Sequence, residues 1–203
     1  NSIGAFPWRN SKPNQFAPLM SWFYGLFIND YILQEKIPQN YATEELPVGG
    51  EWAFRSCAAS IFRTKQPLSL DSENEEKNVS EDPLDPINLM GPNLAKFYIS
   101  AMAEASCSKL EPVYQLYDIA KIELSNVRFF NVDNSMRLRV DLDVLCKETF
   151  FMKDLKSDSV VQGSESIANS WHRISLEKSV EKLEWTVVDI DSWIENEANK
   201  IKF

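Results

Sequence analysis

The stretch MRLRVDLDVLCKE, residues 136–148, constrains the fold more than any other part of the sequence. Its even positions from Met136 to Cys146 are apolar, and most of its odd positions are charged. Strict alternation over this length is typical of a β-strand with one face on an apolar core. We expect the charged face to be solvated and to carry cross-strand ion pairs, because carboxylates beside guanidinium groups have lowered pKa values and make poor general acids. Its members are Arg137, Arg139, Asp141 and Asp143.

Three more runs have the composition of strands. Residues 120–130 (AKIELSNVRFF) alternate but change parity, so we expect a β-bulge near Asn126. The following VDNS, residues 132–135, has the side chains of a hairpin turn. A polar excursion at 153–170 comes next, and residues 171–191 then contain two further alternating runs, WHRISLEKS and EWTVVDID. The pattern predicts an antiparallel sheet of about four strands.

Helical periodicity occurs before the strands and once after them. Apolar residues recur three and four positions apart over residues 16–36 and again within residues 90–110, and residues 51–62 also favour a helix. Ser192 and Glu195 form a capping box, which predicts a short C-terminal helix. Helices followed by a run of antiparallel strands predict an α+β fold, with the N-terminal helices packed on the sheet.

The sequence divides into an N-terminal part, residues 1–50, and a single α+β domain, residues 51–203. The first part joins an extended arm to an apolar helix, which either pack on this domain or dock on a partner. A third alternative, a helix lying at a membrane surface, is less favoured because its polar face lacks basic residues. Residues 69–88 are acidic and are expected to form a mobile loop. The expected partner-binding residues are the aromatic side chains Phe6, Trp8, Trp22, Phe23 and Phe27.

Charge and cysteine content exclude several classes of function. The formal net charge is −9 and no run of five basic residues occurs, which argues against a nucleic-acid partner. No apolar stretch reaches the ~20 residues of a membrane span, although peripheral membrane proximity stays open. Cys57, Cys107 and Cys146 lie far apart with no C-x-x-C pair, which favours a reducing compartment and supports neither a disulfide framework nor a zinc knuckle.

Few residues suggest chemistry. The sequence contains no G-x-x-x-x-G-K-[ST], G-x-G-x-x-G or G-x-S-x-G motif, so we expect no cofactor, no metal and no catalytic set. His172, the only histidine, shares parity with Ile174 and Leu176. It either points to the apolar face as an acid or base or, as we favour, makes one hydrogen bond at a sheet edge. Asp189 and Asp191 are either a metal-binding pair or, as we favour, charges placed ahead of a helix start.

The order of these parts over residues 94–191 resembles the NTF2-like superfamily, in particular its organellar members with a Tim44-like domain and the related chloroplast-division domains. The resemblance lies in a helix, YDIAKIELSNVRFF, a turn, MRLRVDLDVLCKETFF, a polar loop, WHRISLEKS and EWTVVDID, with Trp171 and Trp185 as landmarks. It implies a cone-shaped sheet wrapped around helices, whose pocket serves protein docking, lipid contact or, in enzyme members, small-molecule chemistry. Tim44-like members attach to membrane machinery. The acidic stretch and the terminal helix depart from the family pattern.

These observations lead us to expect a non-enzymatic structural or protein-interaction subunit of a larger, mitochondrial and membrane-associated assembly. The sequence begins at Asn1 and not at methionine, which fits either a processed organellar protein or a trimmed chain. Together with the resemblance, the first of these leads us to expect a mitochondrial location. The alternative is a small-ligand or lipid-binding pocket, or an enzyme that uses His172 with a nearby carboxylate. The concave face distinguishes the two, because a ligand site needs a cavity above about 300 Å³ with convergent polar groups. The sequence predicts that this face is filled by side chains.

Overall fold

The chain has an α+β fold, as predicted, in which helices precede one antiparallel sheet. The computed structural model describes residues 5–8, 11–17, 19, 22, 45–62, 89–132, 135–179 and 184–194. Within these ranges the sheet has four strands in the order β1-β2-β3-β4, and all neighbouring strands are antiparallel. The elements are α2 (Glu45–Phe62), α3 (Pro92–Cys107), β1 (Leu110–Val132), β2 (Ser135–Asp154), β3 (Ser159–Ser179) and β4 (Thr186–Ile190).

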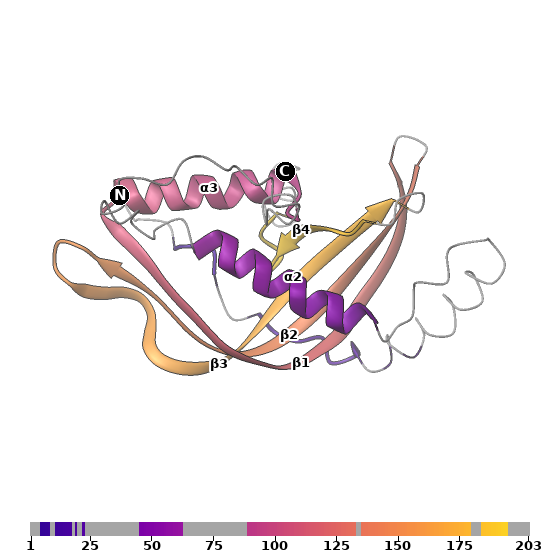
Figure 1. Cartoon of the computed structure of the whole chain (residues 1–203), viewed down its shortest axis with the longest axis horizontal. Helices are drawn as coiled ribbons and strands as arrows, with labels where there is room; N and C mark the ends of the chain where they lie inside the picture. The colour runs from indigo at the N-terminus through magenta and orange to yellow at the C-terminus, as the bar shows by residue number, and fades with distance from the viewer. Residues whose placement is uncertain are drawn as a thin grey trace, which may run out of the picture.

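The long strands curve around the two helices, so the sheet has a concave and a convex face (Figure 1). The predicted apolar row of β2 lies on the concave face and is buried from Leu138 to Cys146. Helix α2 packs closely on this row, because a Cβ atom added at Gly50 would collide with Leu142 Cδ1. Gly50 therefore serves close helix–sheet contact, at a conformational cost to the helix interior of about 0.5–1 kcal/mol relative to alanine.

Several local predictions are confirmed. Helix α3 starts at Pro92, inside the predicted range, and the β1–β2 hairpin closes at the pair Val132 and Ser135. The β1–β2 ladder shifts register between Leu124 and Asn126, where the parity change predicts a bulge. The sequence pattern was sufficient here because turn chemistry and side-chain parity are local properties.

The polar excursion expected at residues 153–170 is instead part of a long β-hairpin. Strand β2 continues to Asp154 and β3 begins at Ser159, so only a short turn separates them. Most side chains of β3 before Ser170 are exposed, and their polarity conceals the strand from hydrophobic periodicity. Backbone hydrogen bonds with β2 stabilise this segment as a strand, and these bonds do not depend on the polarity of its side chains.

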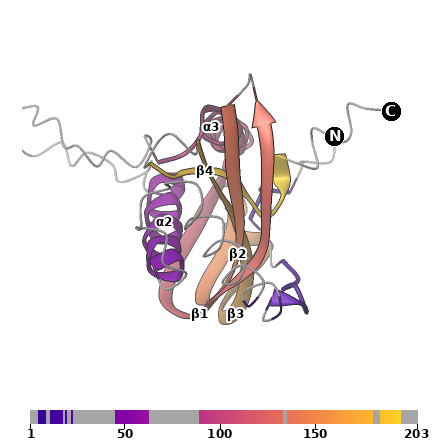
Figure 2. The same cartoon turned by 90° about the vertical axis from the view of Figure 1, so that its right-hand side faces the viewer.

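The N-terminal arm is part of the domain. Phe6 and Trp8 are buried in the main core cluster, and Ser11 N donates a hydrogen bond of 2.6 Å to Trp171 O, which lies on β3 before the stretch that pairs with β4. The arm then reaches the convex face, on the side of the sheet opposite α2 (Figure 2), where Asn14 N donates to Asp143 Oδ2 over 2.6 Å. The predicted division after residue 50 falls inside α2.

The expectation that the charged row is solvated is wrong for two of its four members. Asp141 and Asp143 are only 4% and 1% exposed. Asp143 accepts two hydrogen bonds from Arg173, at 2.7 and 3.1 Å, in addition to the one from the arm. Asp141 accepts from Arg128 and from Ser175. The row does form cross-strand ion pairs, but contact with the arm contributes to its burial.

Several predicted segments lie outside the described residues. Of the helix predicted at 16–36, the structure describes Phe16, Ala17, Leu19 and Trp22 only, and the acidic stretch at 69–88 lies entirely outside the described residues. The C-terminal helix predicted from Ser192 is described only to residue 194. None of the described helices is long and apolar enough to span a membrane.

Candidate functional site

Among the described residues, a cluster of ionisable side chains on the concave face is built from two neighbouring strands. Cys146 and Glu148 are two residues apart on β2, so both point to the same face. On β3, Ser170 pairs with Cys146 and His172 pairs with Val144, which places His172 diagonally across from Cys146. As the parity of the sequence predicts, His172 lies on the same face as Ile174 and Leu176, and all three are buried.

Both ring nitrogens of His172 contact carboxylates. Nδ1 lies 2.9 Å from Asp191 Oδ2, and Nε2 lies 2.9 Å from Glu148 Oε1. The His172 side chain is completely buried, so the favoured expectation of a single hydrogen bond at a sheet edge understated both its burial and its partners. This geometry supplies the acid–base pairing that the alternative hypothesis required, but within the protein core.

The two carboxylates determine the charge of His172. Burial pulls the pKa of His172 down, but the charge and hydrogen bonding of Asp191, with contacts to Cys146 and Glu148, outweigh it and hold the pKa well above 6.5. Burial acts to raise the pKa of Glu148, and the hydrogen bond and charge of His172 bring it below its ordinary value. At neutral pH the cluster is therefore an imidazolium between two carboxylates.

Trp8 of the arm covers this cluster. Its ring centroid lies 4.7 Å from that of His172, and its Nε1 donates a hydrogen bond of 3.3 Å to Glu148 Oε2. Phe54 of α2 contacts the same imidazole at 5.4 Å between ring centroids. Aromatic faces around a buried imidazolium are favourable cation–π contacts. The arm thus closes the site as well as filling the core.

Asp189 and Asp191 have separate roles. Asp189 accepts a hydrogen bond of 3.1 Å from Ile194 N, as the helix-start interpretation predicts. Asp191 Oδ1 instead accepts hydrogen bonds from Ser11 Oγ at 2.8 Å and from Arg173 N at 3.0 Å. Its other oxygen, Oδ2, contacts His172. Its backbone has a φ of 56°, a conformation that aspartate tolerates better than most residues. Among the described residues, neither acid is part of a group of three or more side chains with metal-ligand geometry.

Within the described part of the chain, one group of side chains has metal-ligand geometry. The ligand atoms of Cys146, Glu148 and His172 all lie within 4.8 Å of one another. The sequence offered only Cys146-Lys147-Glu148 and the parity of His172 as signals. The expectation of no metal rested on the single histidine, the absence of a cysteine pair and the absence of clustered carboxylates. The strand register that joins them cannot be read from side-chain types.

The predicted partner-binding residues fall into three groups. Phe6 and Trp8 are buried within this chain and offer no exposed contact surface in this conformation. Trp22 is 59% exposed, and Phe16 and Leu19 beside it in sequence are 66% and 50% exposed. Phe23 and Phe27 lie outside the described residues.

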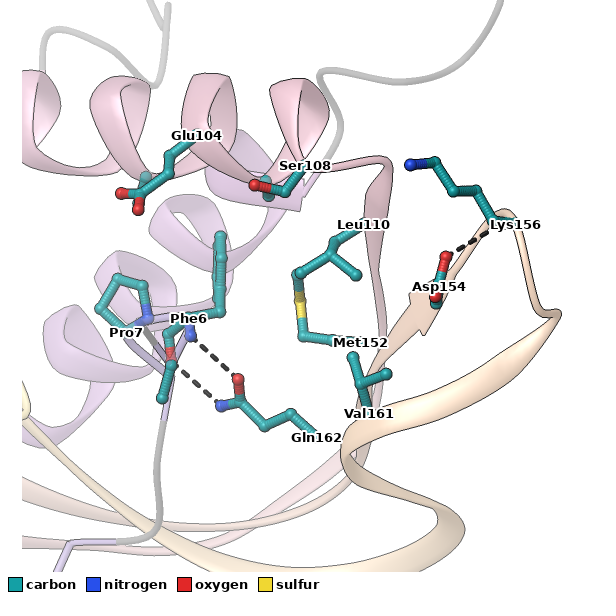
Figure 3. Close-up of a pocket in the computed structure, with 13 residues that line it drawn as sticks. Phe6, Pro7, Glu104, Ser108, Leu110, Met152, Asp154, Lys156, Val161 and Gln162 are labelled. Atoms are coloured by element: carbon teal, nitrogen blue, oxygen red, sulfur yellow. Dashed lines mark hydrogen bonds between the residues drawn. The ribbon is translucent and has the colours of Figure 1, made fainter. Parts of the chain in front are cut away.

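A cavity of about 460 Å³ opens beside the arm, between α3 and the β2–β3 hairpin. Figure 3 shows Leu110 and Met152 in its apolar lining and Glu104 and Lys156 at its edge. The arm forms one wall, because the Phe6 backbone exchanges two hydrogen bonds with the Gln162 side chain, at 2.9 and 3.1 Å. The concave face is therefore filled around His172 and open at this end.

A second cavity, of about 410 Å³, lies at the opposite end of α3, where the helix starts. Lys178 is part of its lining, and Lys178 Nζ lies 5.3 Å from the centroid of the Trp185 ring. Burial lowers the pKa of Lys178 to about 8. The same cavity is lined by Arg137, Glu177 and Glu184, so its charges are mixed.

Comparisons with known proteins assign no family to this chain. No protein-family model and no curated protein matches the sequence. Among solved structures, one match is the crystal structure of the intermembrane space region of chloroplast protein ARC6, with 14% sequence identity and a TM-score of 0.39. The match covers 75% of this chain and 96% of that chain. A likeness at this level assigns neither an activity nor a partner.

Proposed function

We propose that this protein is a non-enzymatic protein-interaction subunit. The observation that carries the proposal is the closure of the His172 cluster by Trp8, which is only 2% exposed. An acid–base catalyst must reach its substrate within hydrogen-bonding distance. Both nitrogens of His172 are already bonded to carboxylates, and an indole ring stands over the imidazole.

Exposed apolar side chains directly follow the docked arm. Phe16, Leu19 and Trp22 are spaced three residues apart, and each is at least half exposed. Asn14 fixes the chain just before them. Its backbone N–H donates a hydrogen bond to Asp143 Oδ2, and its side-chain Nδ2 donates to Ser125 O over 2.7 Å. A tethered group of large apolar side chains is typical of a protein-docking surface, in which tryptophan is a frequent hot spot.

The test is affinity capture of the tagged chain from its native cells. The wild type is compared with a variant that carries Phe16→Ser, Leu19→Ser and Trp22→Ser. Val161→Ser with Ile167→Ser serves as the matched control, because these β3 side chains are 54% and 52% exposed. We expect salt-resistant, stoichiometric partners with the wild type and the control, and their loss with the arm variant.

Two results would count against the proposal. One is a wild-type chain that is recovered alone and monomeric. The other is a partner set that both variants retain equally. All substituted side chains are largely exposed, so the melting temperatures of the variants should stay close to that of the wild type.

A second candidate function is the binding of a small amphipathic ligand in the cavity beside the arm. Its volume of about 460 Å³ exceeds the roughly 300 Å³ at which ligand sites begin. Its lining combines Met152 and Leu110 with the polar Gln162 and the charged Glu104. Ala101→Trp would occupy this space, so we expect it to abolish the binding of a fluorescent fatty acid, whereas the exposed Ile99→Trp should leave that binding unchanged.

We further propose that the fold is an NTF2-like cone. The support is a curved antiparallel sheet of four strands with α2 and α3 on its concave side. An experimental structure tests this, since a cone needs the concave face to narrow toward one end of the helices. A flat sheet with helices on both faces would contradict it.

A further inference from the structure

The cluster beneath Trp8 combines three kinds of metal ligand. A thiol, a carboxylate and an imidazole from Cys146, Glu148 and His172 lie within 4.8 Å of one another, and all three residues are buried. Sulfur, nitrogen and oxygen ligands together suit zinc, which favours four-coordinate sites. We propose that this cluster binds one zinc ion as a structural site. This inference stands independently of the proposed protein-interaction function.

The distances between ligands are close to those of a zinc site. Zinc bonds of about 2.0–2.3 Å place neighbouring ligand atoms about 3.3–3.6 Å apart in a tetrahedral arrangement. His172 Nε2 and Glu148 Oε1 are 2.9 Å apart, joined by a hydrogen bond that the ion would replace. The two side chains therefore need to separate by only about 0.4 Å to admit a tetrahedral ion. Their strands can remain in place.

Hydrogen bonds already orient two of the three ligands. Asp191 Oδ2 accepts from His172 Nδ1 at 2.9 Å, which directs Nε2 toward Glu148 and Cys146. This is the carboxylate–histidine arrangement that usually supports a zinc-bound imidazole. Asp191 is itself fixed by Ser11 Oγ at 2.8 Å. Trp8 Nε1 holds one oxygen of Glu148 at 3.3 Å and leaves the other facing His172.

A buried hydroxyl group lies beside the same carboxylate. Tyr114 Oη is buried and meets no partner with strict hydrogen-bond geometry among the described residues. Burial raises the pKa of Tyr114, and so do the charge and hydrogen bonding of the neighbouring Glu148. The hydroxyl is therefore placed at a side chain that would bind the ion. A tetrahedral zinc site needs a fourth ligand, and Tyr114 Oη is the candidate for that position.

The surroundings indicate a structural rather than a catalytic ion. Trp8 and Phe54 cover the imidazole, and His172 is fully buried. A catalytic zinc keeps one position open to substrate, whereas a structural zinc is closed. The ion would join β2 and β3 and, through Trp8 and Ser11, strengthen the attachment of the arm.

The test uses the full chain. The protein is unfolded in the presence of a chelator, refolded under reducing conditions with Zn²⁺ or Co²⁺, and then desalted. Bound metal is counted by mass spectrometry, and Co²⁺ ligation is followed by its thiolate charge-transfer absorption. The variants are Cys146→Ser and Asp191→Asn, and the matched control is Cys107→Ser, because Cys107 is exposed and outside the cluster. Circular dichroism establishes that each variant is folded.

We expect one equivalent of metal and a thiolate–cobalt band in the wild type and in Cys107→Ser. Cys146→Ser should abolish the band, and Asp191→Asn should keep it with about 10- to 100-fold weaker affinity, since Asp191 only orients His172. A folded wild type that retains less than a tenth of an equivalent overturns the proposal. A band that survives Cys146→Ser also overturns it. If Cys146→Ser does not fold, the Cys107→Ser variant decides. Loss of the thiolate–cobalt band in Cys107→Ser would assign the thiolate to Cys107 and would also overturn the proposal.

Discussion

Trp8 is the residue on which both the core and the His172 cluster depend. Its ring packs against Phe54, Phe62, Tyr114 and His172, at centroid distances from 4.7 to 5.9 Å. Trp8→Ala should therefore lower the free energy of unfolding by about 3–5 kcal/mol, as expected for a fully buried tryptophan. Urea unfolding measures the change, and Trp22→Ala, at a residue 59% exposed, is the control with an expected effect within about 0.5 kcal/mol.

His172 should make the stability of the metal-free protein depend on pH. Because its folded pKa lies well above 6.5, its contribution is fully present below that pH and is lost as the pH rises toward the folded value. We expect the free energy of unfolding to fall as the pH rises above 6.5, by up to about 1.4 kcal/mol per pH unit. His172→Gln should show a flatter profile over the same range. Parallel profiles would mean that His172 is neutral in the folded protein.

At the scale of elements, the sequence identified the strands better than their register. The alternation of β2 and the parity of His172 correctly place both on the concave face, because a side chain's face follows from strict period two. The β2–β3 ladder, however, shifts register twice, between Glu148 and Phe150 and between Met152 and Lys153. Counting back from the Asp154–Ser159 pair without these shifts would set His172 opposite Asp141 on the other face. For that reason the sequence alone could not predict that the side chains of Cys146, Glu148 and His172 lie together.

Gly163 is the residue that makes this irregular hairpin possible. It has a φ of +76°, and an added Cβ atom would collide with Phe150 O. Gly163→Ala should therefore destabilise the protein by about 1–3 kcal/mol. Gly49→Ala is the matched control, because a Cβ atom at Gly49 meets nothing within 4 Å and should stabilise α2 by roughly 0.5–1 kcal/mol. Thermal unfolding of the two variants should shift in opposite directions.

The N-terminal arm illustrates a second limit of sequence-based prediction. Phe6 and Trp8 were expected to bind a partner, but they are buried in the core of this chain. The sequence left open whether the arm packs on this domain or docks on a partner. The answer depends on long-range contacts such as Tyr98 Oη with Pro7 O at 3.0 Å and Ser11 N with Trp171 O. These contacts join positions more than ninety residues apart, and no local pattern encodes them.

At the scale of the whole molecule, the arm crosses the edge of the sheet and contacts both of its faces. Deleting residues 1–15 removes Phe6 and Trp8 from the concave face and Asn14 from Asp143. We expect the truncated chain to bind the dye anilinonaphthalene sulfonate and to unfold less cooperatively, because apolar surface and a buried carboxylate become exposed. Unchanged dye binding and an unchanged melting temperature would show that the domain folds independently of the arm.

Amide hydrogen exchange measured by NMR at Ser11 and Asn14 tests whether the arm belongs to the folded domain. Their backbone N–H groups donate to Trp171 O and Asp143 Oδ2, so an arm that belongs to the domain must protect them. We predict protection within about tenfold of that of the β3 amides, in line with opening as one cooperative unit with the sheet. Exchange at the rate of an unfolded chain at both positions, while β3 stays protected, would contradict the central claim that the arm closes the His172 cluster.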